Sequence, residues 1–161
     1  MKNETFAARA FLGNRKLWEE PKIAFFASND ANENVLEKIR CWSRNQAKNG
    51  VCFIGAFHSE AENALFRATL RNGGKAIQIL GKNIPETFSR DERKAFDENR
   101  LLVISCFHRE NFTKATSLFA NHIAAMHAEA VVFAHISEKS RLFPFYKRLL
   151  ENRKADVTRV K

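Results

Sequence analysis

The sequence contains little cysteine, and its three cysteines are poorly placed for a disulfide framework or a metal site. Cys41, Cys52 and Cys106 are odd in number and include no C-x-x-C pair. Disulfide frameworks of small secreted proteins use an even set of cysteines, and thiolate zinc sites use closely spaced pairs. The sequence therefore argues against both, and a cytoplasmic location is the simplest prediction.

Long hydrophobic runs are also missing. No run approaches the about 18 to 20 apolar residues that a membrane-spanning helix needs. The opening MKNETFAARA lacks the apolar stretch of a secretory signal. We therefore predict no membrane partner.

Several well-known site motifs are absent as well. No G-x-G-x-x-G follows the first apolar run, and neither G-x-x-x-x-G-K-[ST] nor G-x-S-x-G occurs. The histidines show neither H-x-x-x-H nor H-E-x-x-H spacing, so they do not form a recognisable zinc site. We predict no cofactor, no metal and no catalytic residue. Whether the protein is an enzyme stays open, with a non-catalytic role favoured.

What the chain does contain is a regular alternation of short apolar runs and helical patterns. Strands that alternate with helices form parallel sheets, because right-handed crossovers connect them. We therefore expect a single α/β domain over residues 1–161. Its Rossmann-like three-layer fold would have a mostly parallel sheet of five or six strands and helices on both faces. The predicted strands are 23–27, 51–54, 76–80, 101–105 and 130–134, and 156–160 would add an edge strand.

Helix signals lie between these runs. Ser59 is followed three residues later by Glu62, which is the spacing of a capping box. Trp42 lies on an apolar stripe with Leu36 and Ile39, so we interpret it as a core contact. Residues 1–22 form an N-terminal segment that packs on the domain edge. The predicted helices are about 32–48, 59–72, a charged one from 89, 113–129 and 142–153.

Small, hydroxyl and imidazole residues follow the strands, at the rim where α/β folds bind ligands. Gly55 permits close backbone approach, and a helix that starts at Ser59 offers N–H groups to a phosphate. Ser59 as a plain helix cap is an equally good interpretation. His58, His108 and His135 follow three different strands, so they could act on or bind a phosphate-bearing ligand.

Positive charge is uneven along the chain. The net charge is +9, and residues 139–161 hold eight basic residues against two acidic ones. Such a cluster attracts phosphate polymers, although a solvated basic helix has the same composition. The residues predicted to contact nucleic-acid phosphates are Lys147, Arg148, Arg153 and Lys154.

The run VCFIGAFHSEAENALFRATLRNGGKAIQILGKNI, residues 51–84, resembles the core of the DNA-processing (DprA/Smf) Rossmann domain. It is most similar to a short, stand-alone branch whose motif reads SGFHS-x-x-E. Other matching pieces are ASND after the first strand, Trp42, RLLVIS with Phe107, and AHIS at residues 134–137. The similarity covers about residues 21–140.

The resemblance implies a Rossmann-like domain of the nucleotide-sensing SLOG superfamily. Its members bind nucleotides, nucleotide-derived ligands or single-stranded DNA at the rim. Motif matching and the rim pattern together give one predicted ligand-binding set. Its members are Ser28, Asn29, Gly55, Phe57, His58, Ser59, Ser105, His108, Asn121 and His135.

The chain also departs from the family pattern. Ile54 precedes Gly55 where the family has Ser, and Ala120 precedes Asn121 where the family has Arg, which removes an expected phosphate contact. Asn99 replaces the glycine before the RLLVIS run. The P-G-G-x-G-T-x-x-E motif of the hydrolytic relatives is absent.

The predicted function is therefore non-catalytic binding of a nucleotide, another phosphate-bearing small molecule or single-stranded DNA by a homo-oligomer. One alternative is a nucleotide-processing hydrolase of the cytokinin-activating, lysine-decarboxylase-like type that uses His58 or Glu62. The other is a degenerate scaffold that acts through oligomerisation.

Overall fold

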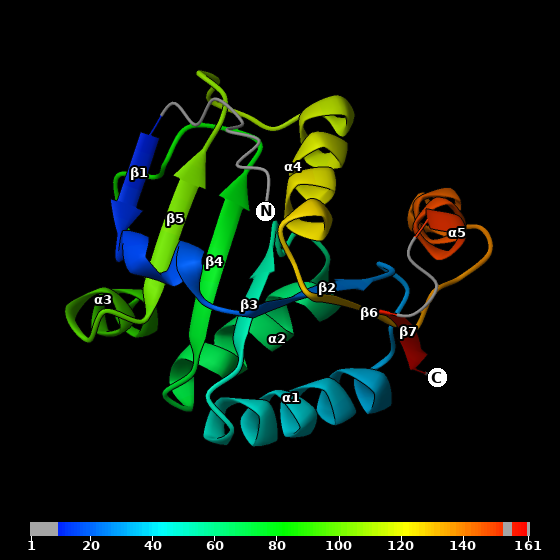
Figure 1. Ribbon diagram of the computed structural model, residues 1–161, viewed down its shortest axis with the longest axis horizontal. Helices are drawn as coiled ribbons and strands as arrows, with labels where there is room; N and C mark the ends of the chain where they lie inside the picture. The colour runs from blue at the N-terminus through cyan, green and yellow to red at the C-terminus, as the bar shows by residue number, and fades with distance from the viewer. Residues whose placement is uncertain (1–9, 153–155, 161) are drawn as a thin grey trace.

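The computed structural model describes residues 10–152 and 156–160, which form one seven-stranded sheet with helices on both faces (Figure 1). The strands are β1 (Ala10–Gly13), β2 (Lys22–Ala27), β3 (Cys52–Gly55), β4 (Lys75–Leu80), β5 (Leu101–Ser105), β6 (Ala130–Ala134) and β7 (Val157–Val160). The helices are η1 (Arg15–Glu19, 3-10), α1 (Glu33–Lys48), α2 (Glu60–Arg71), α3 (Arg90–Asp97), α4 (Lys114–Met126) and α5 (Leu142–Asn152).

The strand order is β1-β5-β4-β3-β2-β6-β7, and β1 is antiparallel to β5 while the other neighbours are parallel. From β2 the chain adds β3, β4 and β5 in one direction. It then crosses back through α4 and adds β6 on the other side of β2. The strand order thus reverses between β2 and β6, which is the position where open α/β sheets bind ligands.

Alternation along each strand divides the core into two layers. Phe25 faces the layer that holds α1, α2 and α3, where its ring lies 5.9 Å from that of Trp42. Phe26, the next residue, faces the opposite layer and lies 5.1 Å from Phe145 of α5. Successive side chains of a strand point to opposite faces, so both layers bury apolar area against the same strands. The predicted core role of Trp42 is confirmed.

The predicted α/β class, the parallel central strands and the helices on both faces are confirmed, but the strand count was too low. From the sequence we predicted that Phe11 and Leu12 belong to an N-terminal segment packed on the domain edge, without a strand. In the structure they form the edge strand β1. All four residues of β1 are exposed, so the strand carries no alternating apolar pattern to reveal it. The predicted edge strand at 156–160 is present as β7, parallel to β6.

Helix α4 lies very close to the sheet because its inner face is built of small residues. Ala120 and Ala124 are fully buried. At the end of β4, a Cβ on Gly81 would lie 2.9 Å from the Thr116 Oγ1 and 3.1 Å from the Thr116 carbonyl oxygen. Gly81 is therefore needed for the first turn of α4 to sit against the strand. Within the described residues, no helix is both long and apolar enough to cross a membrane.

Candidate functional site

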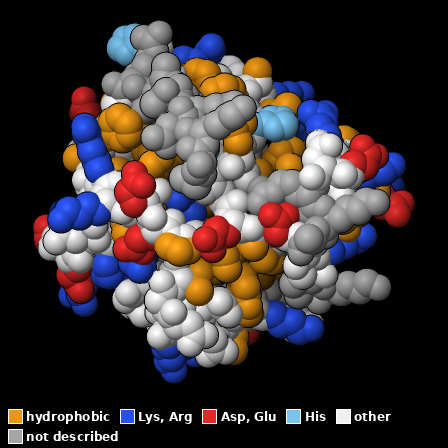
Figure 2. Space-filling view, in the orientation of Figure 1, with side chains coloured by type: hydrophobic (Ala, Val, Ile, Leu, Met, Phe, Trp, Pro, Cys, Tyr) orange, Lys and Arg blue, Asp and Glu red, His pale blue; other side chains and the backbone are white. Residues whose placement is uncertain are grey.

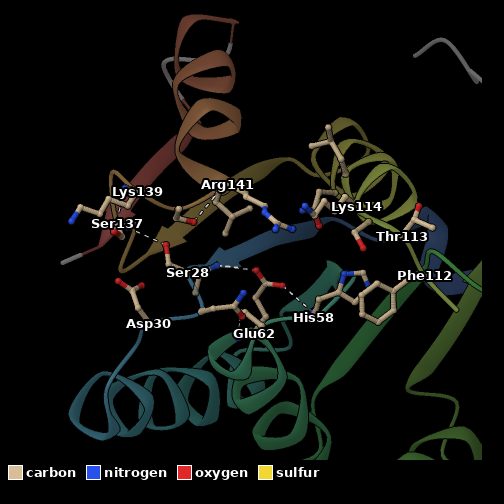
Figure 3. A pocket seen from close by; sticks show the side chains of 18 residues that line it. Ser28, Asp30, His58, Glu62, Phe112, Thr113, Lys114, Ser137, Lys139 and Arg141 are labelled. Atoms are coloured by element: carbon tan, nitrogen blue, oxygen red, sulfur yellow. Dashed lines mark hydrogen bonds between the residues drawn. The ribbon is translucent and has the colours of Figure 1, made fainter.

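A cavity of about 830 Å³ opens at the carboxyl rim of the sheet, where the strand order reverses (Figure 3). Loops after β2, β3 and β6 form its floor and one side, and the starts of α4 and α5 form the other side. Its lining residues are Ala27, Ser28, Asn29, Asp30, His58, Ser59, Glu62, Phe112, Thr113, Lys114, Ser117, Leu118, Asn121, Ser137, Lys139, Ser140, Arg141 and Leu142.

Ser28 joins the β2 and β6 sides of the cavity. Its side chain is buried, and its Oγ accepts a hydrogen bond of 3.0 Å from the Ser137 amide (Figure 3). Its own amide donates to the His135 carbonyl oxygen at 3.3 Å. His135 has a left-handed backbone, with φ at 54°, and its Nε2 lies 3.5 Å from Asp30 Oδ1. Ser28 thus holds the two loops on either side of the switch point together.

Glu62 lies in the floor of the cavity and is 3% exposed. Its Oε2 accepts from the Ala27 amide at 3.0 Å, and its Oε1 accepts from the His58 amide at 3.1 Å (Figure 3). Ser59 caps α2 as predicted, since its Oγ accepts from the Glu62 amide at 3.1 Å. The Glu62 side chain was expected to complete a capping box, but it reaches across to the sheet and fastens the end of β2 to the β3 loop.

The burial of Glu62 changes its acidity. Desolvation raises its pKa from 4.5 to about 7, against the opposing effect of hydrogen bonds from the backbone of Ala27, Ser59 and His58 and from the Ser59 side chain. A buried carboxyl group loses its hydration, which penalises the charged form. Glu62 can therefore gain or lose a proton near neutral pH.

His58 and Phe112 form an aromatic pair at the cavity wall. Their ring centroids lie 4.6 Å apart, with an interplanar angle of 15° (Figure 3). Desolvation lowers the pKa of His58, and the positive charge of Lys82 lowers it further, so the ring is largely neutral at pH 7. Phe112 is itself 52% exposed, which leaves part of an apolar ring open at the cavity.

Three basic side chains provide the positive charge of the cavity: Lys114, Lys139 and Arg141. Lys114 is the first residue of α4, while Lys139 and Arg141 precede α5. In Figure 3, Lys114 from the start of α4 and Arg141 from the turn before α5 extend over the same space, above Glu62. The start of α4 adds the positive end of a helix dipole, with Thr113 as the cap. We call these three residues the basic wall.

Asn121 contributes an unused acceptor. It lines the cavity from α4, and its Oδ1 is buried without a hydrogen-bond partner. Buried polar atoms in folded proteins nearly always have a partner, so an open acceptor in a cavity wall suits a ligand or a water molecule. The neighbouring Ala120 is buried against the sheet, so an arginine at that position would point away from this cavity.

The structure brings half of the predicted ligand-binding residues to the cavity. Ser28, Asn29, His58, Ser59 and Asn121 line it, while the other five lie elsewhere.

The other five have identifiable positions of their own. Phe57 is buried and stacks on Phe66, with ring centroids 4.7 Å apart. Gly55 packs against the Phe57 ring, since a Cβ at Gly55 would lie 3.2 Å from Phe57 Cε1. Ser105 Oγ donates to the Lys82 and Phe107 carbonyl oxygens, so it ties two loops together. His108 and His135 are outside the cavity lining.

The predicted nucleic-acid residues are separated by the geometry of α5. Lys147 and Arg148 are both exposed, but Lys147 Nζ lies 5.8 Å from the centre of the Phe143 ring. Arg148 is near α4 instead, where its charge adds to desolvation in lowering the pKa of His122. Arg153 and Lys154 lie outside the described residues.

Sequence reasoning missed the basic wall, Asp30, Phe112, Thr113 and the serines at 117, 137 and 140. Thr113-Lys114 carried a usable signal, because a threonine at the start of a helical pattern predicts a cap and places the next residue at the helix start. Lys139 and Arg141 belong to the basic cluster predicted at residues 139–161, but nothing local shows that α5 begins beside α4. Among the described residues, no group of three or more His, Cys, Asp or Glu side chains is arranged to hold a metal ion.

Comparison with known proteins identifies the fold. No protein-family model matches the sequence, and no curated protein matches it. DNA processing protein A (DprA) from Streptococcus pneumoniae superposes with a TM-score of 0.74 at 21% identity, over 94% of this chain and 54% of that one. DprA from Helicobacter pylori, described for its unique single-stranded DNA binding mode, gives 0.73 at 17% identity, over 94% and 70%.

A Moco carrier protein from Chlamydomonas reinhardtii gives a TM-score of 0.50 at 14% identity, over 88% of this chain and 90% of that one. The chain spans about half the length of the S. pneumoniae protein. The fold and the rim cavity thus define a Rossmann-type α/β domain with its cavity at the topological switch point. More particularly, the chain has the fold of the DprA Rossmann domain.

Proposed function

We propose that the rim cavity binds a nucleotide, or a nucleotide unit of single-stranded DNA, without chemical turnover. The observation that supports this most directly is the basic wall, in which Lys114 of α4 and Arg141 of the loop before α5 extend over one cavity (Figure 3). The cavity volume of about 830 Å³ lies within the roughly 300 to 1,000 Å³ of small-molecule sites.

The phosphate is expected against the basic wall rather than at the start of α2. The amides of Ala27 and His58 already donate to the Glu62 carboxylate, so the β3 side presents an acid to the ligand. A phosphate gains from cations and from a helix amino end, and it is repelled by a carboxylate. Both favourable features occur at Lys114 on α4.

The base of the nucleotide is expected beside Phe112. Every base has an aromatic face, and stacking on an aromatic side chain contributes about 1–3 kcal/mol without sequence preference. Asn121 Oδ1 offers an acceptor for a sugar hydroxyl or a base amino group. A mononucleotide and one unit of a single strand share this chemistry.

Single-stranded DNA is the favoured macromolecular ligand for two reasons. The likeness to H. pylori DprA, described as a single-stranded DNA binder, supports it. In addition, Arg148 lies beyond the basic wall on the α4 side of α5, where a longer strand could continue. We keep a cytoplasmic location, a single domain over residues 1–161 and homo-oligomer formation as predictions.

Binding is tested by fluorescence anisotropy with a labelled oligothymidylate and by thermal stabilisation with nucleoside monophosphates. The double variant Lys114→Ala, Arg141→Ala removes two cations of the basic wall and should weaken oligonucleotide binding at least tenfold, because contacts to phosphate dominate affinity. Lys38→Ala, Lys48→Ala on α1 is the matched control, since it removes the same charge from the other face of the sheet. Equal weakening by both variants would show a diffuse charge effect and contradict the proposed site.

Hydrolysis of the nucleotide is the second candidate, because the pKa of Glu62, about 7, suits a general acid or base. Against it, both Glu62 oxygens are occupied by backbone amides. We expect purified protein to release neither base nor phosphate from nucleoside monophosphates. Turnover that is lost in Glu62→Gln but retained in Glu60→Gln would establish the enzyme instead.

A further inference from the structure

We infer that binding of a phosphate-bearing ligand in the rim cavity takes up a proton from solvent, and that the Glu62 carboxylate receives it. The inference rests on the proposed function, because it describes the same cavity with its ligand bound. It makes the affinity of the site dependent on pH through the protein rather than through the ligand.

The geometry places an acid and an anion site in one enclosure. Glu62 lies in the floor, and the basic wall extends over it from the starts of α4 and α5 (Figure 3). A ligand phosphate held by Lys114 and Arg141 therefore enters the space above the Glu62 carboxylate. Two negative charges in one poorly hydrated cavity repel each other, and the protonated form of the weaker acid relieves that repulsion.

Glu62 differs from the other acid of the cavity. The Asp30 side chain is 58% exposed and lies 3.5 Å from His135 Nε2, so solvent screens its interactions. Glu62 is almost completely buried, and solvent screens its interactions only weakly. Because desolvation, opposed by the hydrogen bonds to the carboxylate, brings the pKa of Glu62 to about 7, a further rise on ligand binding produces net proton uptake at neutral pH.

Several other charged or titratable groups belong to the elements packed around Glu62. The hydrogen bonds from the backbone of Ala27, Ser59 and His58 favour the ionised carboxylate, and a bound phosphate adds a negative charge to the cavity that opposes it. His58 is largely neutral because desolvation and Lys82 lower its pKa. These groups include Glu33 of α1, Asp30 after β2, His58 after β3, Glu60 of α2, Lys82 after β4, Lys114 of α4, His135 and Lys139 after β6, and Arg141 before α5.

The proton balance is simple. A water-borne proton binds one carboxylate oxygen of Glu62, which weakens the amide hydrogen bond to that oxygen, while the other oxygen continues to accept an amide N–H and no covalent bond breaks. If the ligand raises the pKa of Glu62 by one unit, about 0.4 proton is taken up per ligand at pH 7. Affinity then falls several-fold between pH 6 and pH 8.5.

Isothermal titration calorimetry tests this with a six-nucleotide oligothymidylate that carries no terminal phosphate. Its phosphodiesters stay ionised throughout this pH range, so the ligand contributes no proton of its own. Titrations at pH 7 in PIPES and in imidazole, which differ in ionisation enthalpy, give the number of protons per bound oligonucleotide. Wild-type protein should show uptake, Glu62→Gln should show none, and Glu60→Gln, which alters an exposed carboxylate of the same helix outside the cavity lining, should retain it.

The possible results distinguish failure of the inference from failure of the proposed function. Binding without uptake in the wild type, uptake that survives Glu62→Gln, or uptake that is lost in Glu60→Gln would overturn the inference and leave the proposed function intact. No binding at pH 6 would overturn the proposed function itself. If Glu62→Gln does not fold, carbon-detected NMR of the wild type replaces it. The carboxyl group with a midpoint near 7 must shift upward when the oligonucleotide is added, and an unchanged midpoint overturns the inference.

Discussion

At the scale of single residues, the site depends on side chains that hold backbone segments in place. Glu62 fastens the end of β2 to the β3 loop, and Ser28 fastens it to the β6 loop. Both are buried, and both accept hydrogen bonds from backbone amides of neighbouring loops or strands. A cavity framed by such bonds keeps its shape without a ligand, which lowers the entropy cost of binding.

The first prediction concerns the pH dependence of stability. The folded-state pKa of Glu62, about 7, is above its ordinary 4.5, so the stability that this group contributes is full below pH 4.5 and is lost as the pH rises through 7. The loss approaches about 3 kcal/mol. Urea unfolding at pH 5 and pH 8 should show wild type losing more stability than Glu62→Gln over this interval.

His58 and His122 act in the opposite direction, since their lowered pKa values make the folded state gain stability as the pH rises. Both variants contain them, so the difference between wild type and Glu62→Gln isolates Glu62. A difference that does not change with pH would show that Glu62 is ionised throughout the range.

The second prediction uses the left-handed backbone of His135, with φ at 54°. A side chain in this region costs roughly 1–2 kcal/mol that glycine avoids. His135→Gly should therefore be more stable than His135→Ala by about 1 kcal/mol, since both lack the imidazole. At the exposed helical position Ala115, glycine should instead be the less stable residue. Urea unfolding measures the stability of the glycine and alanine forms at each position. If alanine is the more stable residue at both positions, backbone strain at His135 is excluded.

At the scale of elements, helix α4 decides the shape of the cavity. Its first turn supplies Thr113, Lys114 and Ser117, and its small inner residues let it lie on β3 and β4. Gly81 at the end of β4 permits this contact, because any Cβ there would meet Thr116. The position of Lys114 in the basic wall therefore depends on Gly81, the glycine that directly follows β4.

The third prediction tests that dependence. Gly81→Ala should destabilise the protein by about 1–3 kcal/mol through overpacking and should also weaken oligonucleotide binding. Gly74→Ala is a matched control, since its Cβ would lie 2.7 Å from Thr69 Cγ2 at the opposite end of β4. It should lose similar stability and keep its affinity. Unchanged binding by Gly81→Ala would show that the first turn of α4 adjusts without moving Lys114.

The fourth prediction separates neighbouring cations of α5. Arg148 lies toward α4, while Lys147 lies over the Phe143 ring. Arg148→Ala should lower the slope of log affinity against log salt by about 0.7 for a long oligothymidylate, the value for one contact to a single strand. Lys147→Ala should leave it unchanged. Anisotropy titrations at two salt concentrations measure both, and equal slopes for the two variants would exclude a path between α4 and α5.

At the scale of the whole molecule, the positions of the cations matter more for ligand selectivity than the net charge does. The chain carries a net charge of +9, and Figure 2 shows Lys and Arg side chains around much of one face with acidic side chains among them. Such a spread surface attracts anions at a distance but selects none. Selectivity requires cations fixed beside a cavity, as in the basic wall.

The sequence predicted what depends on neighbouring residues. Strand and helix alternation, the Ser59 cap and the core role of Trp42 follow from local spacing, and the structure has all three. It did not predict that Glu62 reaches Ala27, because that contact depends on how α2 lies on the sheet. Arg141 and Lys114 likewise meet only because the chain crosses back over the sheet through α4.

The antiparallel pairing of β1 with β5 means that β1 cannot join the sheet until most of the chain has been synthesised. Ala10 pairs with Ser105, and everything from η1 to α3 lies between them in the chain. A ribosome therefore releases β1 long before its partner strand exists. During that interval Phe11 and Leu12 have no strand to join, and an unpaired apolar strand can pair with other chains. This edge of the sheet is completed only after β5 emerges.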